Sequence, residues 1–425
     1  MTLAGATAVV IGASYPGKRT IYERIRDLGA RLVIVDEPGH WSERLASEGV
    51  ISKWIGAPLT GDADVDAAVA LDALAAADVV PDGVLTFGEL SVPVVARVAA
   101  RLGLPGNPVA AVDTARSKLR TREASERAGL PTPRSRRVRS LDELYAAAGE
   151  LGFPAVVKPE LGASAIGTVR VDSFDSLPDI YRVVRDAVEM PSHGSYFRAG
   201  NDLLLEQYLD GVEFDVDLVL EDGEAVFSSV SQNWPTAEPS FQETGLHCPP
   251  DYGSKPVGRL VELAVQTVQA FGFTGGVLHV EGKCTSTGPR IVEVNARMGG
   301  GRIHEVVEAV WGVDLVEAHL RAALGLPTQL RPSRKPRCTI VNAFVYAPAT
   351  GRLTALPIAE ATSPHGLGVI VDRAAEVGQE VDGPDRVFAT ELVEIYVGAK
   401  NLRRARSLAA DVLRDPPVVE PAAGA

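Results

Sequence analysis

Cysteine is scarce in this chain of 425 residues, and its spacing is wide. The cysteines are Cys248, Cys284 and Cys338, and no two of them form a CxxC pair. Disulfide frameworks and structural zinc sites use several cysteines at short, regular spacings. We therefore exclude both kinds of site and expect three reduced thiols.

Long apolar runs and an excess of positive charge are also missing. No apolar run approaches the ~20 residues that cross a bilayer, and the start MTLAGATAVVIGAS has no basic region followed by a long apolar stretch. With 42 Lys and Arg against 55 Asp and Glu, the net charge of -13 disfavours binding to a nucleic-acid backbone. The sequence thus predicts a cytoplasmic enzyme without a membrane or nucleic-acid partner. Nucleotides need only a few local cations and stay open as ligands.

The composition that is present is typical of a globular protein, with 46% hydrophobic and 23% charged residues. At roughly 150 residues per domain, the length allows two or three packed units. We predict an N-terminal α/β domain at residues 1–115, a central domain at 116–330 and a small C-terminal α+β domain at 331–414. The Ala- and Pro-rich residues 415–425 are expected to form a loose tail.

The first unit alternates strand and helix patterns. The apolar run at residues 7–14, a helical stretch around 21–28 and the strand RLVIVDEPG make a βαβ unit, and DGVLTFGEL adds a strand before the apolar SVPVVARVAARLG. This order predicts an open parallel sheet with covering helices. Gly12 and Gly17 lack the GxGxxG spacing of a dinucleotide site, so tight turns are the simpler interpretation.

The second unit opens with a predicted helix over TARSKLRTREASERAGLPTPR, ended by Gly129 and Pro131. Strands are expected at residues 153–159, TVRVD, 202–209 and EFDVDLVLEDG, with GGVLHVEGK and RIVEVNAR at the end. A helix at 306–324 then leads to a third unit with the strands CTIVNAFVYA and GVIVDRA. The fold class is therefore mixed α/β and α+β.

The most informative local feature is the pair of strands GGVLHVEGK and PRIVEVNAR, which the turn CTSTG joins into a hairpin. Because side chains alternate along a strand, Glu293, Asn295 and Arg297 share one face, as do His279 and Glu281 on the partner strand. Such a group is costly to bury unless a charged ligand lies within it. Magnesium with polyphosphate would satisfy it, whereas a solvated face with a surface ion pair is the simpler alternative.

A second feature is AVVKPELGASAIGTVRV, in which Lys158 ends an apolar strand and a loop of small residues follows. Backbone N–H groups of such a loop, including Gly162 and Ser164, can close over phosphates while the lysine neutralises their charge. The GKS or GKT of a Walker A loop is absent. A hairpin turn with a snorkelling lysine explains the segment equally well.

The third feature, LLLEQYLDGVEFDVDLV, places an apolar run before Glu206. Backbone groups from Glu206 to Leu209 could form an adenine-binding edge, with Glu213 near the ribose. An ordinary core strand and turn is the alternative interpretation of this segment taken alone.

In this order, the three segments resemble the ATP-grasp superfamily over roughly residues 5 to 400. The resemblance implies a fold that clamps ATP between two α+β lobes, with a Rossmann-like first domain and a small closing domain. It also implies ATP and Mg²⁺, for which Mn²⁺ can substitute, as cofactors. The implied ATP contacts are Lys118, Lys158, Gly162, Ser164, Glu206, Gln207, Tyr208, Leu209 and Glu213, and the implied metal ligands are Glu281, Glu293 and Asn295.

Within the superfamily, EVNARMGGG following FQETGLHCP is most similar to the L-amino acid ligases and the carnosine synthase group. This similarity implies that Glu243, with His247 as a second contact, holds the amino group of the first substrate. A satisfied loop histidine is an equal alternative for His247. Arg297 and the backbone of Gly299, Gly300 and Gly301 would bind the substrate carboxylate or its acyl phosphate.

The resulting prediction is an ADP-forming carboxylate–amine ligase that joins two amino acids, or an amino acid and an amine, through an acyl phosphate. Arg297 and Glu243 are the predicted catalytic residues. The rivals are a biotin-dependent type of carboxylase, against which the absence of an AMKM segment argues, a purine-type ligase, and a nucleotide-binding module without turnover. A homodimer is compatible with the sequence.

Overall fold

The N-terminal unit is a parallel four-stranded sheet with a core on each face. The computed structural model describes residues 2–162, 165–189, 202–358, 361–362, 368–384, 386 and 388–421. The strand order is β3-β2-β1-β4, and all neighbours run parallel. The alternate buried positions of β1 enter two core clusters, one with α1 and α12 and the other with α3 and α4. The predicted open parallel sheet is confirmed.

The elements of this unit are β1 (Thr7–Ile11), η1 (Pro16–Lys18), α1 (Arg19–Asp27), β2 (Arg31–Asp36), η2 (Trp41–Glu43), α2 (Arg44–Ser47), β3 (Lys53–Gly56), α3 (Ala63–Ala76), β4 (Gly83–Leu85), η3 (Glu89–Ser91) and α4 (Val92–Leu102). Helices α5 (Val109–Arg116) and α6 (Lys118–Arg127) connect it to the next unit.

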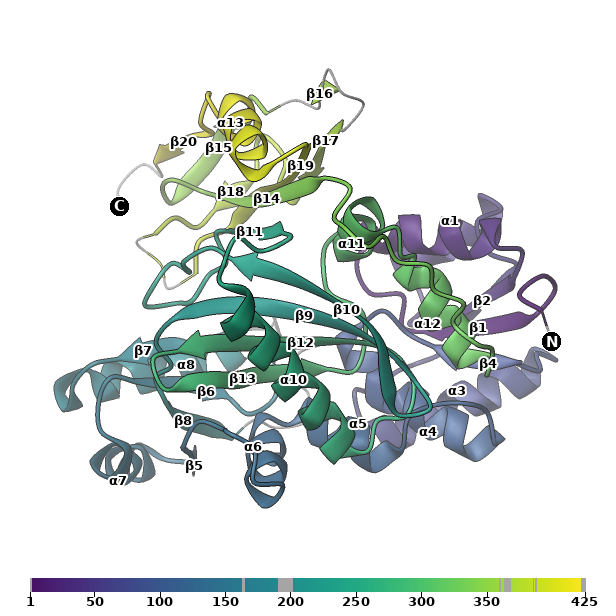
Figure 1. Cartoon of the computed structure of the whole chain (residues 1–425), viewed down its shortest axis with the longest axis horizontal. Coiled ribbons are helices and arrows are strands. Elements are labelled where there is room, and N and C mark those ends of the chain that lie inside the picture. Colours follow the sequence, from purple (N-terminus) through teal and green to yellow (C-terminus); the bar gives the residue numbers. More distant parts are fainter. Residues whose placement is uncertain are drawn as a thin grey trace.

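A small antiparallel sheet in the order β5-β8-β6-β7 forms the first lobe of the central region. Helices α7 and α8 share a core cluster with it, and Figure 1 places this lobe at the lower left. Its elements are β5 (Ser135–Val138), α7 (Leu141–Leu151), β6 (Ala155–Pro159), β7 (Val169–Val171), η4 (Phe174–Ser176), α8 (Leu177–Glu189) and β8 (Leu203–Gln207).

A nine-stranded sheet in the order β13-β12-β9-β10-β11-β14-β19-β17-β16 joins the central and C-terminal regions. Its strands are β9 (Val212–Glu221), β10 (Glu224–Asn233), β11 (Gly245–Cys248), β12 (Gly276–Thr285), β13 (Gly288–Asn295), β14 (Thr339–Tyr346), β16 (Ala361–Thr362), β17 (Gly368–Arg373) and β19 (Glu391–Ala399). The remaining elements are α10 (Ser254–Phe271), α11 (Ile303–Trp311), α12 (Leu315–Ala323), β15 (Gly351–Ala355), β18 (Glu380–Val381), α13 (Leu402–Val412) and β20 (Val418–Pro421). None of the helices within the described ranges is long and apolar enough to cross a membrane.

Three details differ from the sequence predictions. The helix expected from Thr114 is two helices, because Ser117 is extended and its side chain caps α6 by accepting from the Arg120 amide. The helix expected at 306–324 is also broken, since Gly312 is left-handed at the end of α11. The loose tail predicted from residue 415 is wrong for Val418–Pro421, which pairs with β15.

One face of the nine-stranded sheet carries carboxylates near both of its edges. Directly paired residues on neighbouring strands point to the same face. By this register Glu293, Glu281 and Asp215 lie side by side near one edge, and Glu394 faces Asp372 near the other. The opposite face packs on α10 near the first edge and on α13 near the second, each through an apolar cluster. The fold thus presents a row of carboxylates on a rigid surface.

Candidate active site

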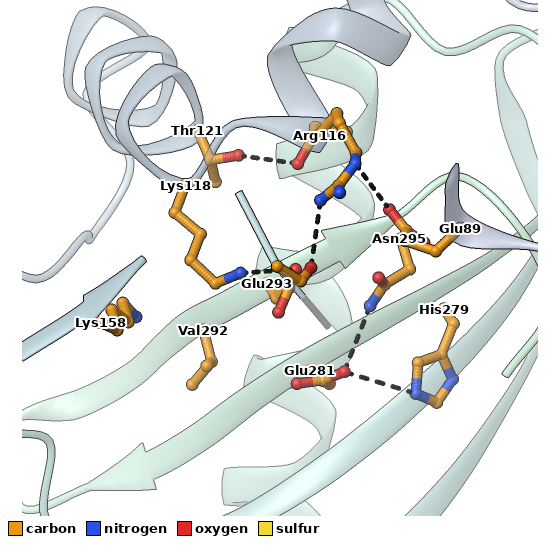
Figure 2. Close-up of polar contacts among 12 residues, drawn as sticks. Glu89, Arg116, Lys118, Thr121, Lys158, His279, Glu281, Val292, Glu293 and Asn295 are labelled. Carbon is orange, nitrogen blue, oxygen red and sulfur yellow. Dashed lines mark hydrogen bonds and ion pairs between the residues drawn. The ribbon is translucent and has the colours of Figure 1, made fainter. Parts of the chain in front are cut away.

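The hairpin of β12 and β13 carries the densest group of polar side chains. Glu281 lies opposite Glu293, and His279 lies opposite Asn295, so the predicted hairpin and its shared face are confirmed. Asn295 Nδ2 donates to Glu281 Oε1 at 3.2 Å, and His279 Nε2 lies 3.9 Å from the same oxygen. Figure 2 shows both side chains directed toward Glu281.

The two facing carboxylates differ in their charge environment. Burial and the neighbouring Glu293 raise the pKa of Glu281 to about 8. Burial would also raise the pKa of Glu293, but Lys118 lowers it instead. The Lys118 ammonium, at the start of α6, lies 3.1 Å from Glu293 Oε1, and Arg116 approaches from the same side in Figure 2. Negative charge around Glu281 is therefore only partly balanced.

The donors of this hairpin fit Mg²⁺. This ion prefers hard oxygen ligands and is usually held by one or two carboxylates plus substrate phosphates. Glu281 and Glu293 offer carboxylate oxygens, and Asn295 offers a carboxamide oxygen. Across the part of the chain that the structure describes, no three His, Cys, Asp or Glu side chains form a preassembled metal cluster. Phosphate oxygens would therefore have to complete the coordination shell.

His279 is surrounded by acidic side chains. Its Nδ1 lies 2.8 Å from Asp217 Oδ1. Burial lowers the pKa of His279, but Asp217, Asp215 and Glu281 outweigh it and raise the pKa to about 9. Asp215, held by Asn233 Nδ2 at 2.9 Å, has its own pKa raised to about 7 by burial and by Glu281. The cluster is strongly biased toward binding positive charge.

Lys158 lies on β6 as predicted, and its buried ammonium faces a carboxylate. Nζ lies 2.6 Å from Glu206 Oε1, and Arg122 Nε lies 2.7 Å from Glu206 Oε2. Burial raises the pKa of Glu206, but Arg122 and Lys158 outweigh this effect and lower it to about 2. Arg122 also donates to the Val292 carbonyl at 2.6 Å. The sequence prediction missed Arg122, because nothing in KLRTREASER distinguishes it from the surface arginines.

The other described residues among the predicted ATP contacts have separate partners. The Gly162 carbonyl accepts from Arg116 Nη1 at 3.1 Å, and Lys283 Nζ lies 3.3 Å from Glu213 Oε2. Tyr208 donates through its hydroxyl to Glu238 at 2.7 Å. Gln207 is exposed, and Leu209 is half-buried beyond the end of β8. Ser164 lies outside the described residues.

Arg297 is held by groups from two units of the chain. Its Nε lies 2.7 Å from Glu89 Oε2, and its Nη2 donates to Asn295 Oδ1 at 3.3 Å. Glu89 sits on η3 of the N-terminal unit and also lies 3.9 Å from Arg116. Neither Glu89 nor Arg116 was predicted, because only the tertiary fold brings η3 over the hairpin. The arrangement fixes one edge of the Arg297 guanidinium beside the metal-ligand candidates.

Glu243 lies in the segment that leads into β11, on the same side as the acidic row. Its side chain is exposed, so burial adds little, and the neighbouring Asp215 and Glu213 raise its pKa. A bound cation would lower the free energy of ionising a carboxyl group that lies near other carboxylates. This environment agrees with the predicted role of Glu243 toward an ammonium group, which no contact in the structure tests.

His247 is buried on β11, and both of its ring nitrogens have protein partners. Nδ1 accepts from Trp234 Nε1 at 3.2 Å, and Nε2 lies 3.3 Å from Asp251 Oδ1. Burial lowers the pKa of His247. This geometry favours the alternative of a satisfied structural histidine over a substrate contact.

The glycines after Arg297 form a tightly packed turn with one open position. A Cβ at Gly299 would lie 2.9 Å from His279 Nδ1. Gly301 has a φ of +50°, and a Cβ there would overlap the Tyr396 hydroxyl. A Cβ at Gly300 meets nothing within 4 Å. Glycine is therefore required on both sides of a backbone segment that has free space at Gly300.

The fold and the hairpin site together define the class of protein. Residues 151–305 match the family model of the ATP-grasp domain, and residues 22–106 match that of the ATP-grasp N-terminal domain. The chain thus contains an ATP-grasp domain and an ATP-grasp N-terminal domain, and the resemblance predicted from its motifs is confirmed.

The relatives of the chain include named ligases. It is 34% identical over 360 residues to carnosine synthase 1 of Gallus gallus, which covers 82% of this chain and 38% of that protein. It is 29% identical over 223 residues to the L-arginine-specific L-amino acid ligase of Bacillus subtilis, which covers 52% of each. The solved L-amino acid ligase from Bacillus licheniformis has a TM-score of 0.81 at 21% identity, over 98% of this chain and 99% of that one. The chain thus spans about two fifths of the length of the carnosine synthase and about half of that of the L-arginine-specific ligase. The similarity to the solved L-amino acid ligase shows the fold of this chain.

The buried Lys158–Glu206–Arg122 triad yields a stability prediction. Glu206→Gln leaves two buried cations without their counter-ion, and breaking such a pair costs about 3–5 kcal/mol. We expect a loss of this size in denaturant unfolding at pH 7. Glu150→Gln is the control, since its ion pair with Arg136 is exposed and should contribute less than about 1 kcal/mol.

The pH dependence of the stabilisation by Glu206 tests the same ion pairs. Because the pKa of Glu206 is lowered to about 2 from 4.5, its stabilisation is present above pH 4.5 and is lost as the pH falls toward 2. The stability difference between wild type and Glu206→Gln should therefore shrink over this range. A difference that stays constant down to pH 2 would contradict the ion-pair account.

Proposed function

We propose that this chain is an ATP-dependent ligase that joins a carboxylate to an amine and releases ADP and phosphate. The observation that carries the proposal is the facing pair Glu281 and Glu293 beside Lys118. Phosphoryl transfer needs positioning and charge neutralisation more than a protein nucleophile, and this hairpin supplies both. The names of the relatives, a carnosine synthase and an L-amino acid ligase, support amino acids as substrates.

ATP would lie between the small sheet and the hairpin. Lys118 on α6 and Lys158 on β6 would neutralise the phosphates. The backbone after β8 would receive the adenine and Glu213 the ribose. The proposed ATP contacts remain Lys118, Lys158, Gly162, Ser164, Glu206, Gln207, Tyr208, Leu209 and Glu213. The proposal also keeps the domain boundaries at residues 115 and 330. The C-terminal unit beyond residue 330 contributes strands to the nine-stranded sheet.

Mg²⁺, or Mn²⁺ in its place, would be held by Glu281, Glu293 and Asn295. When bound, it would neutralise charge on the phosphates. Lys118 would keep Glu293 ionised and oriented, and Asn295 would orient Glu281 through the hydrogen bond already present. These residues thus hold the ligand oxygens in place before any substrate arrives.

In the proposed reaction, a substrate carboxylate oxygen attacks the γ-phosphate of ATP and gives an acyl phosphate and ADP. The amine of the second substrate then attacks the acyl carbon and displaces phosphate. Arg297, held by Glu89 and Asn295, would stabilise negative charge on the acyl phosphate and on the tetrahedral intermediate.

The first substrate would be an amino acid held at both ends. Glu243 would accept its ammonium group, and Arg297 with the backbone of Gly299, Gly300 and Gly301 would bind its carboxylate. The raised pKa of Glu243 supports this role, because a bound ammonium would remove the cost of ionising that carboxyl group. His247 has a smaller part in the proposal, as its nitrogens are already engaged.

Removal of one proposed metal ligand should separate metal binding from folding. Glu281→Gln keeps an acceptor for Asn295 and removes the repulsion with Glu293, so the metal-free protein should unfold at the wild-type denaturant concentration or slightly above it. Its affinity for Mg²⁺ in the presence of ADP should fall at least about 10-fold. Denaturant unfolding without metal measures the first quantity, and thermal unfolding against Mg²⁺ concentration at fixed ADP measures the second. Glu262→Gln, on the exposed side of α10, is the control, and equal Mg²⁺ affinity in all three proteins would refute the metal assignment.

The nucleotide product tests the reaction class. When an amino acid that the enzyme activates is supplied with ATP, and hydroxylamine replaces the amine, the proposal predicts ADP and a hydroxamate in equal amounts. Chromatography measures the ADP, and the ferric colour reaction measures the hydroxamate. AMP with pyrophosphate would mean adenylation and would contradict the acyl phosphate. Formation of ADP that depends on bicarbonate instead of an amino acid would identify the carboxylase alternative.

A further inference from the structure

The segment at residues 234–244, between β10 and β11, carries Glu243 and is fastened to the C-terminal unit. Gln242 Nε2 donates to the Ala389 carbonyl at 2.9 Å, and the Ala389 amide donates to Gln242 Oε1 at 3.0 Å. The Ala237 amide donates to the Gln242 carbonyl at 2.8 Å, so the segment folds back on itself. Glu243 therefore follows directly after a residue whose side chain another unit holds.

Glu238 joins the same segment to the small sheet of β5, β6, β7 and β8. Its Oε1 accepts from the Tyr208 hydroxyl at 2.7 Å, and its Oε2 forms an ion pair with Arg170 Nη1. The Arg170 amide also donates to the Pro239 carbonyl at 2.9 Å. Arg170 lies on β7, and Tyr208 follows β8. Two parts of the small sheet thus hold the two carboxylate oxygens of one side chain.

Aromatic rings and cations surround this contact. The Arg170 guanidinium lies over the Tyr208 ring, 4.6 Å from its centroid, and the ring centroids of Tyr208 and Phe241 are 6.4 Å apart. Lys283 Nζ on β12 lies 6.0 Å and 5.8 Å from the same two rings. A lone exposed ion pair contributes little, whereas a network of hydrogen bonds and cation–π contacts holds its members in one arrangement. The Glu238 contact is therefore a defined junction between the small sheet and the segment.

The small sheet is also the part of the chain that is proposed to hold ATP. Lys158 lies on β6, and the proposed adenine edge from Glu206 to Leu209 includes Tyr208. Strand β6 pairs with both β7 and β8. Bound ATP would restrict the movement of these strands, and through Glu238 it would also restrict the segment that carries Glu243.

We propose that Glu238 is a positioning residue that couples the binding of ATP to the binding of the first amino acid. ATP on the small sheet holds the segment through Glu238 and thereby sets Glu243 for the substrate ammonium. The inference rests on the proposed ligase function, which assigns ATP to the small sheet and the ammonium to Glu243. Because coupling between two binding sites is reciprocal, each substrate should strengthen the binding of the other by the same factor.

Hydrogen exchange with nucleotide alone tests the junction. Mass spectrometry follows amide exchange in peptides of β6 and of residues 234–244, with and without Mg²⁺ and the β,γ-imido analogue of ATP. In wild type the analogue should slow exchange in both, by at least about 5-fold in the segment. Glu238→Ala should keep the slowing at β6 and reduce that of the segment to less than about 2-fold. Glu150→Ala, which removes an exposed ion pair with Arg136 of the same lobe, should behave as wild type.

Affinity for the first amino acid provides a second readout. Calorimetry is done with the amino acid that forms a hydroxamate with wild type. The ATP analogue should tighten its binding by at least about 10-fold in wild type and by less than about 3-fold in Glu238→Ala. Glu238→Gln keeps an acceptor for Tyr208 but loses the charge opposite Arg170, so it should give an intermediate factor.

The outcomes distinguish this inference from the proposed function. Slowed exchange at β6 without slowed exchange in the segment of wild type would overturn the role of Glu238, and this result requires no variant to fold. Wild-type slowing of the segment in Glu238→Ala would also overturn it. No slowing at either place in wild type would reject the proposed ATP site and the inference with it. Absence of ADP and hydroxamate in wild type would instead reject the ligase reaction, while the exchange measurement would still decide whether Glu238 joins the small sheet to the segment.

Discussion

The repulsion between two carboxylates in register is the constraint on which the site depends. Glu281 and Glu293 face each other across β12 and β13, with Asp215 next to Glu281 on β9. A sheet holds such groups at fixed spacing, so they cannot move apart to reduce the repulsion. The chain offsets part of it with Lys118 and with His279, whose pKa the neighbouring carboxylates raise. The rest would favour a divalent cation, so the proposed metal site follows from the register of the sheet.

The N-terminal unit supplies the other half of the electrostatic arrangement. Glu89 on η3 holds Arg297, and Lys18 on η1 reaches the turn that follows Arg297. Both elements follow the carboxyl ends of parallel strands, where open α/β sheets generally bind ligands. Packing of α12 against this sheet fixes the unit to the central region. The N-terminal unit and the central region therefore both contribute polar side chains to the candidate site.

Local patterns in the sequence predicted what depends on neighbours in the chain. Alternation placed Glu281, Glu293 and Asn295 on one face, and the apolar run before Lys158 placed it on a buried strand. Contacts between distant segments could not be obtained in this way. Arg122 pairs with a residue 84 positions away, and Lys18 contacts one 281 positions away; each is an ordinary basic residue in its own segment. The union of the central and C-terminal strands in one sheet was missed for the same reason.

Transfer of oxygen from substrate to phosphate tests the central claim most directly. The first amino acid is supplied with ¹⁸O in both carboxylate oxygens. After complete turnover the products are separated, and mass spectrometry measures the ¹⁸O content of each. Attack of the carboxylate on the γ-phosphate, followed by displacement by the amine, must leave one ¹⁸O in inorganic phosphate and one in the amide. Label in AMP, or phosphate without label while the amide forms, would contradict the acyl phosphate and with it the role given to the carboxylate hairpin.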